Sequence, residues 1–254
     1  MTAIVGILCK DGVVIGTDSS ATFGQGQAHT IEQPTDKIHI IKDKIIVTAT
    51  GEVGLLQRHK QIIEDMWEKK EFSKEFILPN NQNNSRLNIG KSISTKTIND
   101  FSSTHLKQFQ LASLVAFPFD YKAHLCEFGI GTIQPEFKDE RLWYCSLGSS
   151  QHITDTFLAF IRDVFWQNER PTLVEGIFAT SWVLDHTISI NTGGVNGPVK
   201  IAILNNVKGE IKAEMVVEHV LSEQKQNIDE VKSELRKWSK KFKPINALDI
   251  PKLT

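Results

Sequence analysis

The most constraining feature of this sequence is a short motif near its start, in which Asp11-Gly12 separates two apolar runs. Residues 3–9 and 13–17, on either side of the motif, are rich in Ile, Val and Leu. An Asp-Gly pair between two such runs is the strongest short-range signal for a β-hairpin, because these residues accept the positive φ angles of the turn. The chain is therefore predicted to begin with two paired strands, with Thr2 at the open end of the hairpin.

Thr2 is the second residue of the chain, and its side chain is small enough for an aminopeptidase to remove Met1. A threonine with a free α-amine carries a nucleophile and its own general base in one residue. Many chains have a small second residue and begin with a strand without any such chemistry, so further residues have to complete a site. These are a cation near the hydroxyl, a carboxylate that holds the cation, and a backbone N–H aimed at the oxyanion.

Composition excludes several classes of function. The chain has 254 residues, 40% hydrophobic and 23% charged, with a formal net charge of −1 and no basic stripe, which argues against general nucleic-acid binding. No apolar run reaches the roughly 18 residues of a membrane span, and the first strand is too short for a signal peptide. Cys9, Cys126 and Cys145 lie in apolar runs without metal-ligand spacing, which is typical of core thiols in a cytoplasmic protein. We expect no cofactor and no metal.

Strands and helices are expected in blocks. Helices are predicted at 55–70, 93–108, 151–165, 173–186 and 221–242, and further strands at 37–41, 45–50, 111–117, 123–129, 141–146, 199–204 and 211–217. Blocks of this kind favour antiparallel sheets with separate helix layers, an α+β fold with two sheets face to face and a helix pair on each outer side. Residues 19–36 are expected to form a loop with a short strand at His29–Glu32. We predict one domain over residues 1–220 and a helical C-terminal extension over 221–254.

Two charged residues are candidates for the partners of Thr2. Asp18 ends the second strand of the hairpin, so hairpin pairing places it near Thr2; otherwise it is a turn residue that caps the next loop. Lys37 begins the third strand, and if this strand pairs beside the first hairpin, its ammonium can point at Thr2 with Asp18 as counter-ion. Burial would lower the pKa of this lysine and the carboxylate would oppose the shift. The alternative is a surface lysine at a strand start.

Three more residues are candidates at turns. Gly51 lies between a strand and a helix, where free backbone N–H groups form an oxyanion site, unless it is a plain connecting glycine. Ser149, in the turn Gly148-Ser149-Ser150, is either a site residue or the N-cap of the following helix. Asp185 is expected at a helix C-terminus, where the helix dipole disfavours a carboxylate, so it should have another partner.

Together these motifs resemble the β-type subunits of proteasomes, within the wider family of N-terminal nucleophile (Ntn) hydrolases. The resemblance is strongest over residues 2–56. It is carried by Thr2, Ile4-Val5-Gly6, Lys10–Val14, Thr17-Asp18-Ser19, Lys37-Ile38 and Ala49-Thr50-Gly51.

The resemblance implies a four-layer αββα sandwich and a threonine-type endopeptidase in a self-compartmentalised protease of stacked rings. Thr2 would be the nucleophile after loss of Met1, Lys37 and Asp18 would tune it, and the Gly51 N–H would bind the oxyanion. Ser149 and Asp185 would hold the amine and relay protons. The implied partners are further copies of the chain, unfolded protein or peptide substrates, and an ATPase unfoldase. Ala49 would lie at a pocket floor that favours large apolar residues.

The sequence departs from the family pattern at several places. The segment between Asp18 and Lys37 is about three residues longer than usual, and the serine turn allows the role of Ser149 to slip by one position. After the last helix the family usually has Asp, two residues and then Ser-Gly, a pattern that this sequence does not keep. The roles of Asp185, Ser189 and Thr192 therefore stay open. The polar insert at 79–92 and the helical tail favour a bacterial-type relative. Two other functions stay open: an inactive structural ring subunit, and an Ntn amidase that acts on a small molecule.

Overall fold

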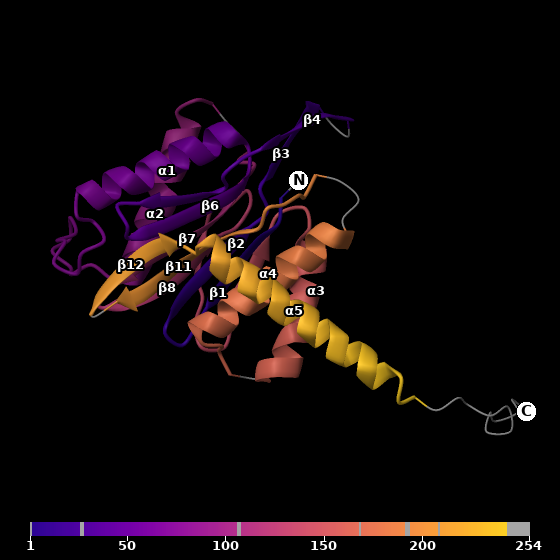
Figure 1. The fold of residues 1–254 in the computed structure, drawn as a ribbon. Coiled ribbons are helices and arrows are strands. Elements are labelled where there is room, and N and C mark those ends of the chain that lie inside the picture. Colours follow the sequence, from indigo (N-terminus) through magenta and orange to yellow (C-terminus); the bar gives the residue numbers. More distant parts are fainter. Residues whose placement is uncertain are drawn as a thin grey trace, which may run out of the picture.

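The computed structural model describes residues 2–25, 28–105, 108–167, 169–190, 194–207 and 209–242. The described chain contains two five-stranded antiparallel sheets and a separate two-stranded ribbon (Figure 1). The first sheet has the order β10-β1-β2-β11-β12, with β10 Tyr144–Leu147, β1 Ile4–Leu8, β2 Gly12–Thr17, β11 Lys200–Val207 and β12 Glu210–Met215. The second has the order β5-β6-β7-β8-β9, with β5 Ile38–Ile41, β6 Ile45–Gly51, β7 Leu111–Phe119, β8 Lys122–Phe128 and β9 Pro135–Phe137. The ribbon pairs β3 (Ser20–Gln25) with β4 (Ala28–Pro34).

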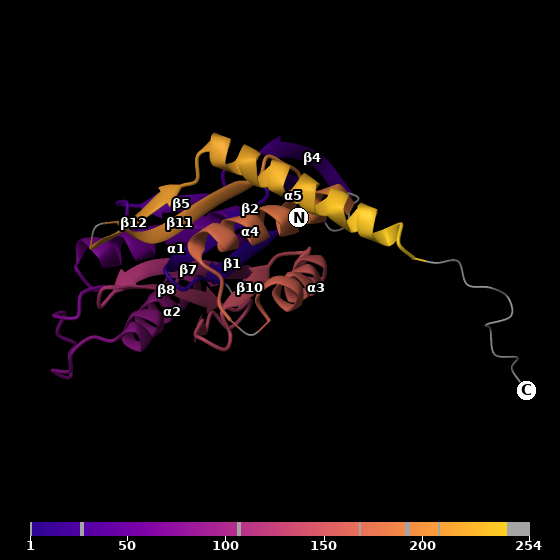
Figure 2. The ribbon, with the colours of Figure 1, turned by 60° about the horizontal axis from the view of Figure 1, so that its bottom comes forward.

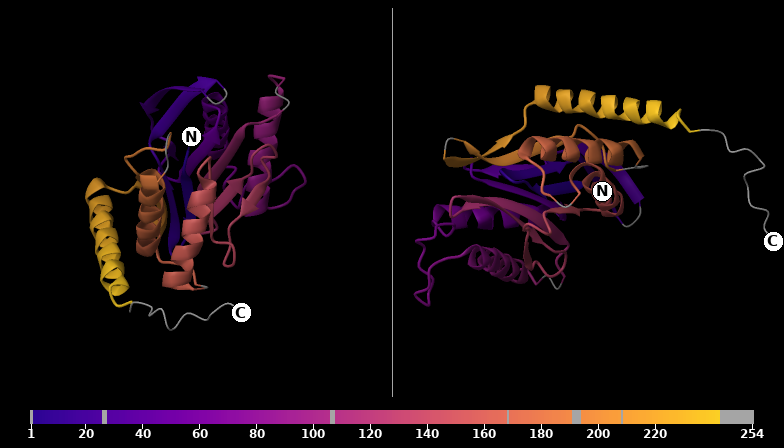
Figure 3. Two further views of the ribbon diagram at one scale, coloured as in Figure 1. Left: turned by 90° about the vertical axis from the view of Figure 1, so that its right-hand side faces the viewer. Right: turned by 90° about the horizontal axis from the view of Figure 1, so that it is seen from below.

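Helices cover the outer face of each sheet. The second sheet is covered by α1 (Val53–Glu68) and α2 (Arg86–Ser102), and the first sheet by α3 (Gln151–Ile161) and α4 (Leu173–Ile190). One π-helical turn, η1 (Arg162–Trp166), continues α3. Figure 2 and the right-hand view of Figure 3 show α4 on one side of the two sheets and α2 on the other. The predicted four-layer αββα sandwich is confirmed.

Alternation along the strands explains the layering. In β6, Ile45 and Val47 pack into the cluster beneath α1 and α2, whereas Ile46 faces the first sheet. Successive side chains of a strand point to opposite faces, so one apolar strand supplies both interfaces of its sheet. Strands β1 and β2 are buried along their whole length, which explains why both read as unbroken apolar runs.

A fifth helix, α5 (Glu218–Ser239), packs against α4 outside the helix layer. Ile228 at its middle is buried, but the C-terminal half of α5 extends away from the body (Figures 1 and 3).

Two local predictions were wrong, one conditional strand pairing is not found, and one strand was missed. Most of residues 19–36 form the β3–β4 ribbon instead of a loop, since strands of mixed polar composition give no period-2 signal. The strand at 37–41 does not pair beside the first hairpin: β5 is the edge strand of the second sheet. Helix α2 begins seven residues earlier than predicted, because the Ser85 hydroxyl caps it by accepting a bond of 3.2 Å from the Asn88 N–H. Strand β9 was not predicted.

Candidate active site

The β1–β2 hairpin brings Asp18 beside the start of the chain. Its register pairs Ile4 with Thr17, so the next residue along, Asp18, lies next to Ala3. The Asp18 N–H donates to the Ala3 carbonyl at 3.2 Å, and the Ala3 N–H donates back to Asp18 Oδ1 at 3.0 Å. The Ser20 N–H donates to Oδ2 at 3.2 Å. These bonds fix the orientation of the Asp18 side chain, which is fully buried.

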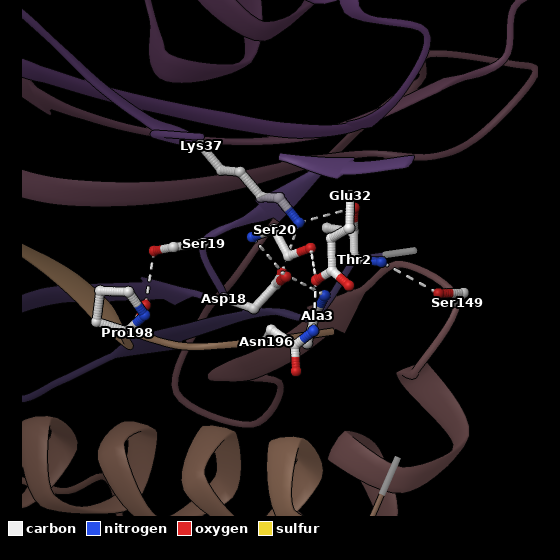
Figure 4. Close-up of polar contacts among 10 residues, drawn as sticks. All are labelled: Thr2, Ala3, Asp18, Ser19, Ser20, Glu32, Lys37, Ser149, Asn196 and Pro198. Carbon is white, nitrogen blue, oxygen red and sulfur yellow. Dashed lines mark hydrogen bonds and ion pairs between the residues drawn. The ribbon is translucent and has the colours of Figure 1, made fainter. Parts of the chain in front are cut away.

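Lys37 reaches the same point from the other sheet. It lies immediately before β5, and its Nζ stands 2.7 Å from Asp18 Oδ1 and 3.3 Å from Thr2 Oγ1 (Figure 4). Burial lowers the pKa of Lys37 because it disfavours the charged form, and the charge of Asp18 opposes that shift. The three side chains therefore form a chain of contacts from carboxylate to ammonium to hydroxyl, across the junction of the two sheets.

A turn between β10 and α3 holds the backbone of Thr2. The Thr2 nitrogen donates to Ser149 Oγ at 3.1 Å, and the Ser150 N–H donates to the Thr2 carbonyl at 3.4 Å. Gly148 permits this approach: it has a φ of +104°, and a Cβ there would lie 2.1 Å from the Thr2 carbonyl oxygen. The Ser149 hydroxyl in this turn thus meets the Thr2 nitrogen.

The structure does not join the other two candidates to this cluster. Gly51 ends β6 with a φ of +122°, next to the start of α1, and no hydrogen bond among the described residues links it to Thr2. Asp185 lies within α4, and its carboxylate pairs with Lys232 of α5 at 3.3 Å instead of with Thr2 or Lys37. The prediction that Asp185 ends its helix was wrong, but it does have another partner. Ser189 donates to the His186 carbonyl, and Thr192 lies outside the described residues.

Sequence reasoning missed three polar residues around this cluster. Glu32 of β4 accepts hydrogen bonds from the Ser20 hydroxyl and from the Asn196 amide (Figure 4). These two bonds lower the pKa of Glu32, so the carboxylate is anionic, and Lys37 adds a smaller electrostatic effect. The only available sequence signal was the strand expected at His29–Glu32, which gave no reason for the strand to fold back over the site.

The described residues contain no cluster of His, Cys, Asp and Glu side chains suited to a metal ion. None of the described helices is long and apolar enough to cross a membrane. The site consists of the Thr2 hydroxyl, the partly desolvated Lys37 ammonium next to it, and the buried Asp18 carboxylate on the other side of the ammonium. It is suited to activating the hydroxyl as a nucleophile.

Known proteins resemble this chain in sequence and in fold. The sequence model of the proteasome subunit family matches residues 2–158, a range that includes Thr2, Asp18, Lys37, Gly51 and Ser149 and ends before Asp185, Ser189 and Thr192. Proteasome subunit beta of Methanobrevibacter smithii is 43% identical over 63 residues, 25% of this chain and 29% of the relative. A subunit of the same name from Methanococcus maripaludis is 44% identical over 62 residues, 24% of this chain and 27% of the relative. The matched segment spans less than a third of these relatives.

Solved structures resemble the whole fold at low sequence identity. Anbu (ancestral beta-subunit) from Yersinia bercovieri has a TM-score of 0.65 at 13% identity, covering 96% of this chain and 99% of that one. A Gly-1 mutant of Anbu from Hyphomicrobium sp. strain MC1 has a TM-score of 0.68 at 11% identity, covering 97% and 100%.

The αββα sandwich, with a threonine at the mouth of its first strand, is the fold of the Ntn hydrolases. Within that class, the chain belongs to the proteasome subunit family, and its similarity is to the β-type subunits.

Proposed function

We propose that this chain is a threonine-type endopeptidase subunit whose nucleophile is Thr2 after removal of Met1. The observation that carries this proposal is the Lys37 ammonium, 3.3 Å from Thr2 Oγ1 and 2.7 Å from Asp18. A structural subunit has no need to bury a lysine at this point. Burial of an ammonium costs free energy that a counter-ion only partly offsets. A buried lysine at this point therefore favours a role in catalysis.

In the proposed reaction the Thr2 α-amine takes the proton of its own hydroxyl, directly or through a water. An α-amine has an ordinary pKa of about 7.7–8.0, which is suited to general-base work near neutral pH. Thr2 Oγ then forms a bond to the peptide carbonyl carbon, the C–N bond breaks, and the leaving amine takes the proton. Water hydrolyses the resulting ester and restores the free hydroxyl.

Four residues have distinct parts in this scheme. Lys37 stabilises the developing negative charge on Thr2 Oγ, and Asp18 holds Lys37 in place. Ser149 holds the Thr2 nitrogen, which becomes the α-amine once Met1 is removed. We assign the Gly51 N–H to the oxyanion, as the end of β6 lies at a strand-to-helix turn. Asp185 has no part in this scheme, because it is paired with Lys232.

The proposed substrates are peptide bonds of unfolded proteins. Copies of the chain would assemble into rings that enclose the sites, with an ATPase unfoldase as a further partner. Ala49 of β6, two residues before Gly51, would leave room for a large apolar residue on the amino-terminal side of the cut.

The decisive experiment is the intact mass of the purified protein with and without a peptide epoxyketone. This reagent closes its ring only on a residue that carries both a hydroxyl and a free α-amine. We expect loss of Met1 and one adduct in the wild type, no adduct in Thr2→Ala, and an unchanged adduct in Thr156→Ala, whose threonine lies on α3.

The same preparations distinguish the other functions. Retained Met1 without an adduct would contradict the proposal and favour an inactive structural subunit. An adduct without cleavage of any protein or peptide substrate, on a protein that stays monomeric in size-exclusion chromatography, would favour a small-molecule amidase. Peptidase activity that survives Thr2→Ala would exclude the proposed mechanism.

A further inference from the structure

Glu32 places a fixed carboxylate at the mouth of the candidate active site. The Ser20 hydroxyl and the Asn196 side-chain amide both donate to the same oxygen, Oε1 (Figure 4). The other oxygen, Oε2, accepts no hydrogen bond from any residue that the structure describes. Ser20 is 2% exposed, whereas Glu32 and Asn196 are exposed at the surface. One oxygen therefore holds the side chain in place, and the other is available to a ligand.

The backbone around Glu32 is held where three segments of the chain meet. The Ser19 N–H donates to the Asn196 carbonyl at 2.9 Å, and the Ser19 hydroxyl donates to the Pro198 carbonyl at 2.6 Å. The Thr35 N–H donates to the Ser19 carbonyl at 3.1 Å. The corner between β2 and β3, the end of β4 and the segment before β11 are thus joined, so the position of Glu32 relative to the start of β1 is fixed.

A single serine links Glu32 to the reacting groups. Ser20 donates through its hydroxyl to Glu32 and through its backbone N–H to Asp18 Oδ2, the latter at 3.2 Å. Asp18 Oδ1 in turn contacts the Lys37 ammonium, which reaches Thr2 Oγ1. A substrate whose carbonyl lies against Thr2 therefore passes close to the Glu32 carboxylate.

The charge of Glu32 has no dedicated counter-ion. Hydrogen bonds from Ser20 and Asn196 lower the pKa of the Glu32 carboxyl, and Lys37 adds a smaller electrostatic effect, so the group is anionic near neutral pH. Lys37 itself is paired with Asp18 at 2.7 Å. Among the ion pairs of the described residues, none includes Glu32. A fixed anion with one open oxygen is complementary to a cationic group that binds beside it.

We infer that Glu32 is a specificity-determining residue, which binds a lysine or arginine side chain of the peptide substrate near the cut. The inference rests on the proposed function, because it names the substrate class of that same site. Glu32 is already held in place, so a pair with a substrate cation should reach the upper end of the range for exposed pairs, about a fivefold gain in kcat/KM. Ala49 lies on β6 and Glu32 on the β3–β4 ribbon, so we assign them different positions of the substrate.

Two other cations compete for the same carboxylate. One is the Thr2 α-amine that removal of Met1 creates, and the other is the free amino terminus of a short peptide. The Thr2 nitrogen already has a partner, Ser149 Oγ at 3.1 Å, which favours the substrate as the source of the cation. Acetylated peptides carry no free amino terminus, so they restrict the test to side chains.

The first test measures kcat/KM of the full-length protein for acetylated, internally quenched peptides that differ only in the position of a single lysine. The parent peptide has glutamine in its place. We expect a gain of about fivefold at one position only, because the carboxylate is fixed. The gain should shrink in about 0.5 M salt, which screens an exposed pair. A lysine that raises kcat/KM equally at every position, or at none, would overturn the inference.

The second test changes the charge of the carboxylate. Glu32→Gln should reduce the ratio of kcat/KM for the lysine peptide and its glutamine parent to within about twofold of one, and Glu32→Lys should make the matching glutamate peptide the better substrate. Glu214→Gln is the matched control, since this exposed glutamate lies on β12 and should leave the lysine preference unchanged. An equal loss on all peptides in Glu32→Gln would assign the carboxylate to the Thr2 amine and overturn the inference.

Labelling of every variant with the peptide epoxyketone separates this inference from the proposed function, and circular dichroism shows whether each variant keeps its fold. An adduct on the wild type and on Glu32→Lys, together with an unchanged lysine preference, would overturn the role of Glu32 alone. A wild type that forms no adduct and cleaves no peptide would contradict the proposed function, and the role of Glu32 would fall with it.

Discussion

The buried Lys37–Asp18 pair allows a quantitative prediction. The exposed fractions of the two side chains are 8% and 0%, so Lys37→Met would leave the Asp18 carboxylate out of water without a cation. Breaking a buried pair in this way typically costs about 3–5 kcal/mol. Asp18 would keep its bonds from the Ala3 and Ser20 N–H groups, which still stabilise the charge. We therefore expect the free energy of unfolding to fall by about 3 kcal/mol, at the low end of that range.

The protein supplies its own control. Lys10 and Glu169 form an ion pair with the same nitrogen–oxygen distance, 2.7 Å, but their side chains are 49% and 78% exposed. An exposed pair contributes about 0–1 kcal/mol, since water screens both charges. Lys10→Met should therefore cost less than about 1 kcal/mol.

Urea denaturation at pH 7, followed by circular dichroism, measures both variants. The cycle is completed with Asp18→Asn and the double variant, which should lose about 2 kcal/mol less than the sum of the two single losses, because residues in direct contact couple. Equal costs for Lys37→Met and Lys10→Met would refute the reasoning from burial.

Two further predictions concern residues next to the site and within the core. His59 is buried between Thr97 and Ser113, and burial lowers its pKa to about 4. The unfolded chain takes up this proton below an ordinary pKa of about 6.5, so stability is fully present above that pH and falls by up to about 3 kcal/mol towards pH 4. His59→Gln should lose most of this slope in chemical denaturation, and exposed His152→Gln should keep it; equal slopes would contradict the assignment. In Gly148→Ala the new Cβ would press on the Thr2 carbonyl, so we expect a more than tenfold loss of peptidase activity. Gly209→Ala, at a φ of +90° in open space, should retain activity, and similar losses in both would exclude a specific effect on Thr2.

Local chemistry made the first part of the site predictable. Asp11-Gly12 fixes the turn of the hairpin, and the turn fixes the register, so Asp18 had to lie beside the start of the chain. The serine turn at 148–150 was a candidate because it opens a helix. Its actual task, holding the Thr2 backbone, depends on β10 pairing with β1, a contact between residues more than 130 positions apart.

Long-range placement was not predictable from residue patterns. Lys37 meets Thr2 by crossing from the second sheet, a route that no local pattern of β5 reveals. The same holds for Glu32 and Asn196, which meet only because the β3–β4 ribbon and the segment after α4 converge on the start of β1 (Figure 4). For Asp185, the helix-dipole argument predicted that the carboxylate has a partner, and it has one. The argument could not decide between Lys232 and a residue of the site.

The way Thr2 is held depends largely on backbone atoms. Its surroundings use many backbone atoms: the Ala3 N–H and carbonyl, the Ser150 N–H, and the Thr2 nitrogen and carbonyl themselves. Backbone groups are present whatever the side chain, so they restrict the sequence only where a Cβ would intrude, as at Gly148. The contacts between side chains at Thr2 depend on Asp18, Lys37 and Ser149, together with Thr2 itself. A site held largely by backbone atoms therefore restricts the side chains at only a few positions of the sequence.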